Sequence, residues 1–356
     1  MNKEMANYID KLLYDSDLFP DKTKQYSNSS SYDFTNETII ITGAAGSIGS
    51  GLSKQLIHCK FKKLILIDNA ESPLYELIKS LEFKDTSKVE FILIDITNQN
   101  SITQVFEKYK PTLIFHTAAY KHVPLMESNP IKALELNIFG TKLLADLSCE
   151  FKVKKFLFIS TDKAVNPISI MGLTKRIAEN YLNLLNSKTN TVFVSTRFGN
   201  ILGSNGSIVP LLKKQIELGL PITLTDINVT RYFICKQKAC NLILKLATLE
   251  KFDYNLYTFN MGNPVKISDL IERMYLICNS EAKTHELKII GLRPGEKLHE
   301  EIISIDEELF KTEHPEILGV KQKKTIQPKN INFSGLLEIN YETSSIDVKS
   351  ILKSYL

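Results

Sequence analysis

A short polar string in the middle of the chain carries the residue types that proton transfer needs. Thr161, Asp162 and Lys163 come at the end of the apolar run 155–160, and Lys175 lies on a predicted helix that begins near Met171. A carboxylic acid beside an amine can supply a general acid and a general base. An isolated Asp-Lys pair at a strand end is more often a surface ion pair. Because ligands of open α/β sheets bind at the carboxyl ends of strands, this string is predicted to face a ligand.

A glycine-rich loop near the N-terminal end has the spacing of a phosphate-binding turn. It follows the apolar run 38–42, opens a predicted helix, and includes Gly43, Ala45, Gly46, Ser47, Ile48 and Gly49. Small residues let the backbone approach a pyrophosphate, and a helix N-terminus offers N–H groups and partial positive charge. A tight turn is the ordinary alternative for a lone glycine motif. Here strand, loop and helix follow in the required order, so we predict a dinucleotide site.

Acidic and small residues after the next strands fit the same site. Asp68 ends the second apolar run, where its carboxylate can accept hydrogen bonds from ribose hydroxyls and repel a 2′-phosphate. This favours NAD, while nearby lysines keep NADP as an alternative. Asp95 and Ile96 are predicted to meet the adenine, although Asp95 could equally be a solvated strand end. Ala118 and Ala119, after the fourth run, leave room for the phosphates and the nicotinamide ribose.

Short apolar runs alternate with helical stretches along the first part of the chain. The runs are 38–42, 63–68, 89–95, 112–117, 155–160 and 191–197. Continuous apolar runs are typical of strands that are buried on both faces. We therefore predict an α/β fold: a Rossmann-type doubly wound parallel sheet with a smaller C-terminal substrate-binding lobe.

The change in pattern along the chain predicts four parts. Residues 1–35 are expected to form an N-terminal helix and a polar arm, and 36–200 the nucleotide-binding domain. Residues 201–310 are expected to form the smaller lobe, with the chain returning in part to the first domain. Residues 311–356 are expected to form a tail that packs on the surface or at a subunit contact.

Composition excludes several classes of protein. The chain has 356 residues, of which 43% are hydrophobic and 24% charged, as in ordinary globular proteins. A net charge of +4 is too small to indicate nucleic acid as a partner. No run reaches the roughly 18 apolar residues of a membrane span, so none is expected. The five cysteines form no CxxC pair, which favours reduced thiols, no metal site and a cytoplasmic protein.

Several blocks in order resemble the UDP-N-acetylglucosamine 4,6-dehydratases, in the polysaccharide-biosynthesis branch of the extended short-chain dehydrogenases/reductases. The blocks are GAAGSIGS (43–50), HTAAYKHVPLME (116–127), STDKAVNPISIMGLTKR (160–176), TRFGNILGSNGSIVP (196–210), TRYF (230–233) and RPGEKLHEE (293–301). Many members carry Tyr-x-x-x-Lys on the catalytic helix. Here Lys175 is retained and Met171 replaces the tyrosine, as in one subgroup of the family. A thioether cannot exchange protons.

The resemblance implies a reaction and a role for each residue. The sugar C4 is oxidised by hydride transfer to NAD, the C5 proton is removed, water leaves from C6, and hydride returns to C6. Lys163 would be the base at C5, and Asp162 would pass a proton to the C6 hydroxyl. Thr161 would bind the C4 oxygen, and Lys175 the nicotinamide ribose. For Lys163 to act so, we expect burial beside Lys175 and a cationic nicotinamide to lower its pKa.

The substrate side is predicted from the same blocks. Asn200 resembles a substrate amide contact of the family, and Lys121 is placed to touch the sugar or its diphosphate. Arg231 and Arg293 could pair with phosphates, since a guanidinium binds phosphate through two hydrogen bonds. Glu296 could accept hydrogen bonds from the uridine ribose. The expected partner is a UDP-sugar.

Other functions stay open at this point. A nucleotide-sugar 4-epimerase shares the fold, the cofactor and the first hydride step, but relies on the tyrosine that Met171 replaces. A catalytically silent NAD(P)-binding regulator would tolerate that replacement. Inversion and retention at C5 are both compatible with these residues, as are UDP or another nucleotide. Family members generally self-associate, so a homo-oligomer, a dimer or a hexamer, is expected.

Overall fold

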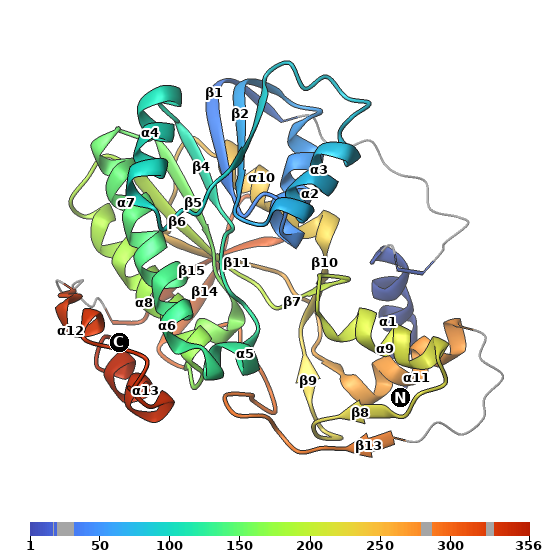
Figure 1. Cartoon of the computed structure of the whole chain (residues 1–356). Coiled ribbons are helices and arrows are strands. Elements are labelled where there is room, and N and C mark those ends of the chain that lie inside the picture. Colours follow the sequence, from blue (N-terminus) through green and yellow to red (C-terminus); the bar gives the residue numbers. More distant parts are fainter. Residues whose placement is uncertain (17, 20–31, 279–286, 325–330) are drawn as a thin grey trace.

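A mostly parallel nine-stranded sheet forms the centre of the larger domain (Figure 1). The computed structural model describes the whole chain except residues 17, 20–31, 279–286 and 325–330. The strands lie in the order β14-β15-β11-β6-β5-β4-β1-β2-β3. Those from β11 to β3 run parallel, whereas β15 and β14 are antiparallel additions at one edge. The predicted α/β fold with a Rossmann-type doubly wound sheet is therefore confirmed.

Each of the six predicted apolar runs forms a strand of this sheet, and β11, β14 and β15 complete it. The strands are β1 (Asp33–Thr42), β2 (Lys60–Asp68), β3 (Val89–Leu93), β4 (Leu113–His116), β5 (Lys155–Ile159), β6 (Val192–Arg197), β11 (Leu256–Phe259), β14 (Glu307–Lys311) and β15 (Ile317–Gln322). β1 starts earlier than predicted, so residues 33–35 belong to the sheet and not to the polar arm. The arm otherwise falls mainly on residues 20–31, outside the described part.

Helices cover both faces of the sheet. One face packs against α2 (Ser47–Leu56), α3 (Glu71–Ser80) and α10 (Lys236–Thr248), and the other against α4 (Gln99–Tyr109), α7 (Thr141–Glu150) and α8 (Ile170–Asn186). β1 and β4 are neighbours although two strands intervene in the chain. The connections therefore diverge between β1 and β4, and this switch point is where such folds bind ligands.

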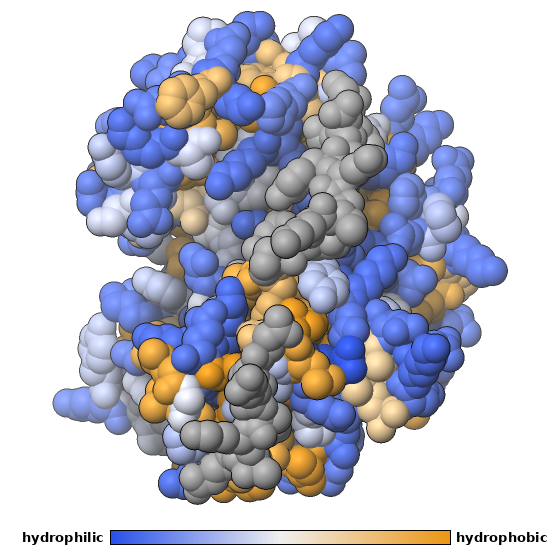
Figure 2. All heavy atoms as spheres, turned by 90° about the vertical axis from the view of Figure 1, so that its right-hand side faces the viewer, coloured by the Kyte–Doolittle hydropathy of each residue, from blue (hydrophilic) through white to orange (hydrophobic). Residues whose placement is uncertain are grey.

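A smaller lobe has its own apolar core, to which the N-terminal helix contributes. It contains α1 (Lys3–Asp15), β7 (Asn200–Leu202), α9 (Ile208–Glu217), β8 (Ile222–Leu224), β9 (Thr230–Arg231), β10 (Phe233–Cys235), β12 (Val265–Lys266), α11 (Ile267–Ile277) and β13 (Leu287–Ile289). Ile9 and Leu13 of α1 are fully buried there. Figure 2 shows apolar side chains on the surface of this lobe; exposed ones include Leu218, Leu220 and Leu276.

The C-terminal residues pack beside α8. Two short helices, α12 (Ser334–Leu337) and α13 (Ser345–Lys353), join α8 in an apolar cluster with α5 (Val123–Ser128), α6 (Pro130–Ala133) and the π-helix η1 (Leu134–Gly140). The expected boundary at residue 310 falls inside the β14–β15 hairpin, which belongs to the large sheet. Among the described residues, no helix has the length and apolar character to cross a bilayer.

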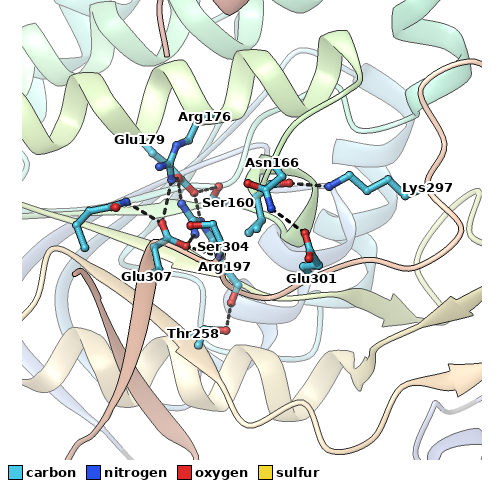
Figure 3. Close-up of polar contacts among 12 residues, drawn as sticks. Ser160, Asn166, Arg176, Glu179, Arg197, Thr258, Lys297, Glu301, Ser304 and Glu307 are labelled. Carbon is cyan, nitrogen blue, oxygen red and sulfur yellow. Dashed lines mark hydrogen bonds and ion pairs between the residues drawn. The ribbon is translucent and has the colours of Figure 1, made fainter. Parts of the chain in front are cut away.

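A buried ionic network ties α8 to the sheet edge (Figure 3). The Arg197 guanidinium is fully buried and binds Glu179 of α8 (Nη2 to Oε2, 2.6 Å) and Glu307 of β14 (Nη1 to Oε2, 2.8 Å). Ser160, just before the polar string, donates a 2.5 Å hydrogen bond to Glu179. Burial opposes ionisation of both carboxylates, but Arg197 outweighs it and lowers the pKa of each. With Arg176 at its partly exposed edge, the network pairs two guanidinium groups with two carboxylates.

Replacing Arg197 with Met should destabilise the fold strongly, because two buried carboxylates would lose their common partner. We expect a loss of about 3–5 kcal/mol in the free energy of unfolding, measured by urea denaturation. Arg176→Met is the matched control: Arg176 also contacts both carboxylates but is partly exposed, so its loss should cost less. A loss below about 1 kcal/mol for Arg197→Met would contradict the assignment.

Candidate active site

Glycines at the first strand-to-helix turn permit contacts that a side chain would block. Gly43 has a φ of +65°, and a Cβ there would lie 2.7 Å from the Cα of Ala118. A Cβ on Gly46 would lie 3.1 Å from the Gly43 carbonyl oxygen, and one on Gly49 would overlap that oxygen. The glycine loop therefore packs against the loop after β4, and α2 packs against the glycine loop. This is the cradle that a dinucleotide pyrophosphate requires.

The predicted acids lie beside this cradle. Asp68 accepts hydrogen bonds from the backbone N–H groups of Ala45 (2.9 Å) and Ala70 (3.0 Å), so it also holds the glycine loop in place. Asp95 accepts from the Thr97 N–H and hydroxyl, both at 2.8 Å, and these bonds lower its pKa against the opposing effect of burial. The predicted Ile96 side chain is 4% exposed and packs in the core.

The N-terminus of α2 has no side-chain cap. Gly46 is the N-cap residue, and the first turn contains Ser47 and Ile48. Amide groups of a first helical turn have no partner within the helix, so they can bind an anion. The backbone N–H of Asn205, in the loop after β7, donates to the Ser47 hydroxyl at 3.1 Å. The smaller lobe therefore contacts the glycine loop directly.

A buried histidine connects the end of β1, just before the glycine loop, to the start of α7. His116 of β4 bonds to the hydroxyls of Thr42 (2.7 Å) and Thr141 (2.9 Å), and Thr141 donates to the Asn137 carbonyl. Burial, with the nearby Lys175, lowers the pKa of His116 well below its usual value, so it stays neutral. His116 had no predicted role, because it lies at the end of an apolar run.

Asn137 fixes the loop after β4 against α8. Its Oδ1 accepts from the Tyr120 N–H (2.9 Å), and its Nδ2 donates to the Tyr120 carbonyl (3.0 Å) and the Thr174 hydroxyl (3.1 Å). Asn137 lies in η1, and π-helical turns frequently occur at functional sites. The predicted Ala119 and Lys121 flank Tyr120, so this amide sets their position.

The predicted proton-transfer residues come together. Asp162 and Lys163 lie on a 3₁₀ turn, η2 (Asp162–Ala164), directly after β5. Lys163 Nζ lies 3.0 Å from Asp162 Oδ1, 3.4 Å from Asn200 Oδ1 and 3.5 Å from Glu300 Oε1. Thr161 Oγ1 donates to Asp162 Oδ1 at 2.8 Å. Side chains from η2, from β7 and from the segment before β14 therefore converge on one ammonium group, which excludes the simple surface ion pair.

The expected lowering of the Lys163 pKa is wrong for this structure. Burial does disfavour the charged form, and Arg231 acts in the same direction. The carboxylates of Asp162 and Glu300 outweigh both, so the pKa of Lys163 is raised. The expectation failed because it considered cations near Lys163 and omitted a carboxylate far away in the sequence. Lys163 is accordingly an ammonium ion when the site holds no substrate.

The two other predicted catalytic positions lie on α8. Lys175 is 5% exposed, and its Nζ lies 3.9 Å from the centroid of the Phe158 ring. Burial lowers its pKa to about 7, although Glu179 acts in the opposite direction. Met171 is 2% exposed and packs in the cluster around α5 and η1. Its thioether therefore fills space beside the site and supplies no proton.

The predicted substrate residues of the smaller lobe form a second group. Arg231 is 6% exposed; its Nη2 lies 3.1 Å from Glu296 Oε1, and its Nη1 donates to the carbonyls of Thr230 and Leu298. Glu296 Oε2 accepts from the Arg293 N–H at 3.2 Å, and the Arg293 side chain is exposed. Arg231 and Glu296 already satisfy each other, whereas the Arg293 guanidinium faces solvent.

The segment that carries Arg293 and Glu296 also contacts the residues directly after η2 (Figure 3). Lys297 Nζ donates to the Val165 carbonyl at 2.8 Å, and Asn166 Nδ2 donates to Glu301 Oε2 at 2.8 Å. Glu300, which lies between Lys297 and Glu301, is a second site residue that, like His116, had no predicted role. Its signal was the pair of adjacent acids in RPGEKLHEE, which the motif contained without an assigned role.

A glycine cradle at the switch point of a doubly wound sheet, with a turn of ionisable residues facing it, defines a Rossmann-type α/β protein with a built active site. Residues 39–322 match the family described as "Polysaccharide biosynthesis protein", and the chain belongs to this family.

Individual relatives carry different names. The capsular polysaccharide biosynthesis protein CapD of Staphylococcus aureus is 42% identical over 280 residues, 78% of this chain and 47% of that protein, so the chain spans about half the length of this relative. The inverting UDP-N-acetylglucosamine 4,6-dehydratase of Campylobacter jejuni is 30% identical over 308 residues (85% and 87% of the two chains). A UDP-glucose 4-epimerase of Rickettsia rickettsii is also 30% identical, over 77% and 80%.

Solved structures agree with the fold. Pen from Bacillus thuringiensis superposes with a TM-score of 0.72 at 30% identity, covering 80% of this chain and 89% of that one. Because relatives of equal identity include a dehydratase and an epimerase, the choice between these reactions depends on the site itself.

Replacing Lys175 with Met should stabilise the protein without ligand. Between pH 10 and pH 7 the unfolded lysine gains a proton that the folded one does not, because burial lowers its folded pKa from 10.5 to about 7. As the pH falls from 10 to 7, the free energy of unfolding of the wild type should therefore decrease relative to that of Lys175→Met. The difference should reach on the order of 2–4 kcal/mol at pH 7. Urea denaturation at several pH values measures this difference. Lys132→Met, at an exposed site, should show no such trend, and a constant difference for Lys175→Met would contradict the assignment.

Proposed function

We propose that this protein is an NAD-dependent nucleotide-sugar 4,6-dehydratase that converts UDP-N-acetylglucosamine to a UDP-4-keto-6-deoxy-N-acetylhexosamine for glycan biosynthesis. One observation carries the proposal: the buried Asp162 and the partly buried Lys163 contact each other just after β5, while Met171 replaces the tyrosine. An enzyme that only moves hydride at C4 has no use for a second base. The name of the Campylobacter relative supports the same reaction.

The glycine cradle supports NAD as the cofactor. A Cβ at Gly43 would clash with the Ala118 backbone and one at Gly49 with the Gly43 carbonyl oxygen, so the close packing of this loop requires glycine. Asp68 lies at the end of β2, where its carboxylate would receive ribose hydroxyls and repel a 2′-phosphate. Lys175 would bind the nicotinamide ribose from α8. When bound, NAD would take up hydride from the sugar C4 and return it to C6. Several solved structures with the same fold are NAD complexes by name, such as a UDP-glucose 4-epimerase of Thermus thermophilus.

Asp162 is the residue best placed to exchange protons with the sugar hydroxyls. It is fully buried, and its Oδ2 has no hydrogen-bond partner among the described residues. Oδ1 is occupied by Thr161 and Lys163. Oδ2 is therefore free to accept the C4 hydroxyl proton and to release a proton to the departing C6 hydroxyl. The two events balance, so Asp162 ends the cycle as it began.

Lys163 acts at C5 in this proposal. Once the C4 carbonyl has formed, the C5 proton becomes acidic, and the Lys163 amine removes it and later returns it. Lys163 must first lose one ammonium proton, because the neighbouring carboxylates raise its pKa and favour the charged form. Asn200 Oδ1 of β7, 3.4 Å away, would orient Nζ.

The nucleotide would lie along the smaller lobe. Arg293 offers an exposed guanidinium for the diphosphate, and Lys121, in the loop after β4, is a second candidate. Arg231 would keep Glu296 oriented, or exchange it for phosphate oxygens when the sugar nucleotide binds. The homo-oligomer, the cytoplasmic location and the identity of the nucleotide stay predictions.

A nucleotide-sugar 4-epimerase is the second candidate, because the Rickettsia relative is as similar as the Campylobacter one. An epimerase requires a proton-exchanging side chain at C4 but no base at C5. Incubation of the protein with UDP-N-acetylglucosamine and NAD, followed by NMR, separates the two. A 4-keto-6-deoxy product supports dehydration, and an epimerised sugar supports the alternative. Unchanged sugar with tight NAD binding would indicate a regulatory protein.

Lys163→Ala should abolish dehydration, because no other amine of the described residues contacts Asp162 and Glu300. We expect a rate reduction of at least about 100-fold with unchanged NAD affinity. Product formation is followed by NMR and NAD binding by calorimetry. Lys132→Ala, a surface lysine on α6, serves as the control and should keep full activity. Wild-type turnover by Lys163→Ala would refute the role of this residue.

Met171→Leu should retain substantial activity, because the thioether provides volume but no proton. Leu and Met have similar volumes, so the buried cluster should lose less than about 1.5 kcal/mol. Activity and thermal unfolding are measured together. A folded Met171→Leu protein without turnover would show that the sulfur has a chemical role.

A further inference from the structure

Glu300 occupies a position that no motif assigned and that the mechanism above does not use. It lies between β13 and β14, and its side chain is 3% exposed. Its Oε1 lies 3.5 Å from Lys163 Nζ, and its Oε2 is buried without a hydrogen-bond partner in the described part of the chain. A buried carboxylate with one free oxygen is costly to maintain, which calls for a functional explanation.

We propose that Glu300 is a positioning residue that holds the Lys163 ammonium and takes its proton when Lys163 becomes the base. The proposal rests on the dehydratase function proposed above. It concerns how Lys163, an ammonium ion without substrate, becomes the free amine that C5 deprotonation requires.

The hydrogen bonds around Lys163 distinguish the two carboxylates. Asp162 Oδ1 accepts from two donors, Thr161 Oγ1 at 2.8 Å and Lys163 Nζ at 3.0 Å. Within the described part of the chain, the Glu300 carboxylate has one polar partner, Lys163, at the longer distance of 3.5 Å. Donors stabilise the ionised form of a carboxylate. Glu300, with fewer donors, is therefore the better acceptor for the Lys163 proton, and Asp162 keeps its charge for the sugar hydroxyls.

The proton balance closes within the site. An N–H bond of Lys163 breaks and an O–H bond forms on Glu300, leaving a neutral amine and a neutral acid. The amine then takes the C5 proton and gives it back when C5 is reprotonated. Glu300 finally returns its proton to Lys163. No proton enters or leaves through solvent, which suits two carboxylates that are both buried.

Other charged groups around Lys163 allow this transfer. Asp162 faces Nζ from η2 and Glu300 from the segment before β14, while Arg231 of β9 acts on it as a more distant cation. Arg231 favours loss of the Lys163 proton, and Asp162 opposes it. Hydrogen bonds hold the segment on both sides of Glu300: Lys297 donates to the Val165 carbonyl, and Glu301 accepts from Asn166. Figure 3 shows these two contacts.

Glu300→Gln tests the proposal, because it keeps the shape of the side chain and removes its ability to take a proton. The wild-type kcat should change little between pH 7 and pH 8.5. In Glu300→Gln, Lys163 must lose its proton to solvent, so kcat should fall by about 100-fold at pH 7 and rise steeply with pH. Glu300→Asp should recover part of the activity at pH 7. Glu308→Gln, at an exposed position of β14, should behave as wild type.

A second readout does not depend on turnover. Lysine labelled with ¹³C at Cε reports the titration of Lys163, whose signal is assigned by its loss in Lys163→Ala. In Glu300→Gln the midpoint should move to lower pH by at least about one unit, since a carboxylate within 4–6 Å favours the ammonium form. The control Glu308→Gln should leave this midpoint unchanged.

The two readouts separate failure of this inference from failure of the proposed function. Wild-type protein that leaves UDP-N-acetylglucosamine unchanged would refute the proposed function, and the lysine titration would still test the contact. A uniform loss of kcat at every pH, with an unshifted Lys163 titration, would mean that Glu300 is merely structural. That result, or full activity of Glu300→Gln at pH 7, would overturn the inference.

Discussion

One buried guanidinium holds the active-site strands and the C-terminal segment together. Arg197, at the end of β6, binds Glu179 of α8 and Glu307 of β14, and Ser160 completes the network from the end of β5. Charges are costly to bury alone, so each member is stable only while the others are in place. The catalytic turn begins at the residue after Ser160, and the segment bearing Glu300 ends at β14. The positions of both depend on this network.

Two lysines at the site show how burial and neighbouring charge compete. Lys163 and Lys175 are both removed from water, which lowers the pKa of any ammonium group. Lys163 faces two carboxylates, and its pKa is raised. Lys175 faces an aromatic ring, and the nearby Glu179 is already paired with Arg197, so the pKa of Lys175 falls to about 7. The same residue type therefore has opposite charge preferences within one site.

The sequence predicted the parts of the structure that depend on neighbouring residues. Apolar runs defined the parallel strands, and the spacing of Gly43, Gly46 and Gly49 identified the loop that packs on Ala118. It could not show contacts between distant segments. Arg197 and Glu307 are 110 residues apart, and nothing near either indicates its partner. Glu300 was missed for the same reason, and with it the direction of the Lys163 pKa.

The N-terminal helix has a practical consequence for anyone preparing shorter forms of this protein. The family match begins at residue 39, but Ile9 and Leu13 of α1 lie in the core of the smaller lobe. Arg273 of α11 binds Asp10 through two hydrogen bonds of 2.7 and 2.5 Å. An expression fragment trimmed to the matched region would expose apolar side chains of the smaller lobe that α1 covers. It would also leave Arg273 without the carboxylate of Asp10. Fragment boundaries for this chain should follow the packing of the lobe and not the limits of the family match.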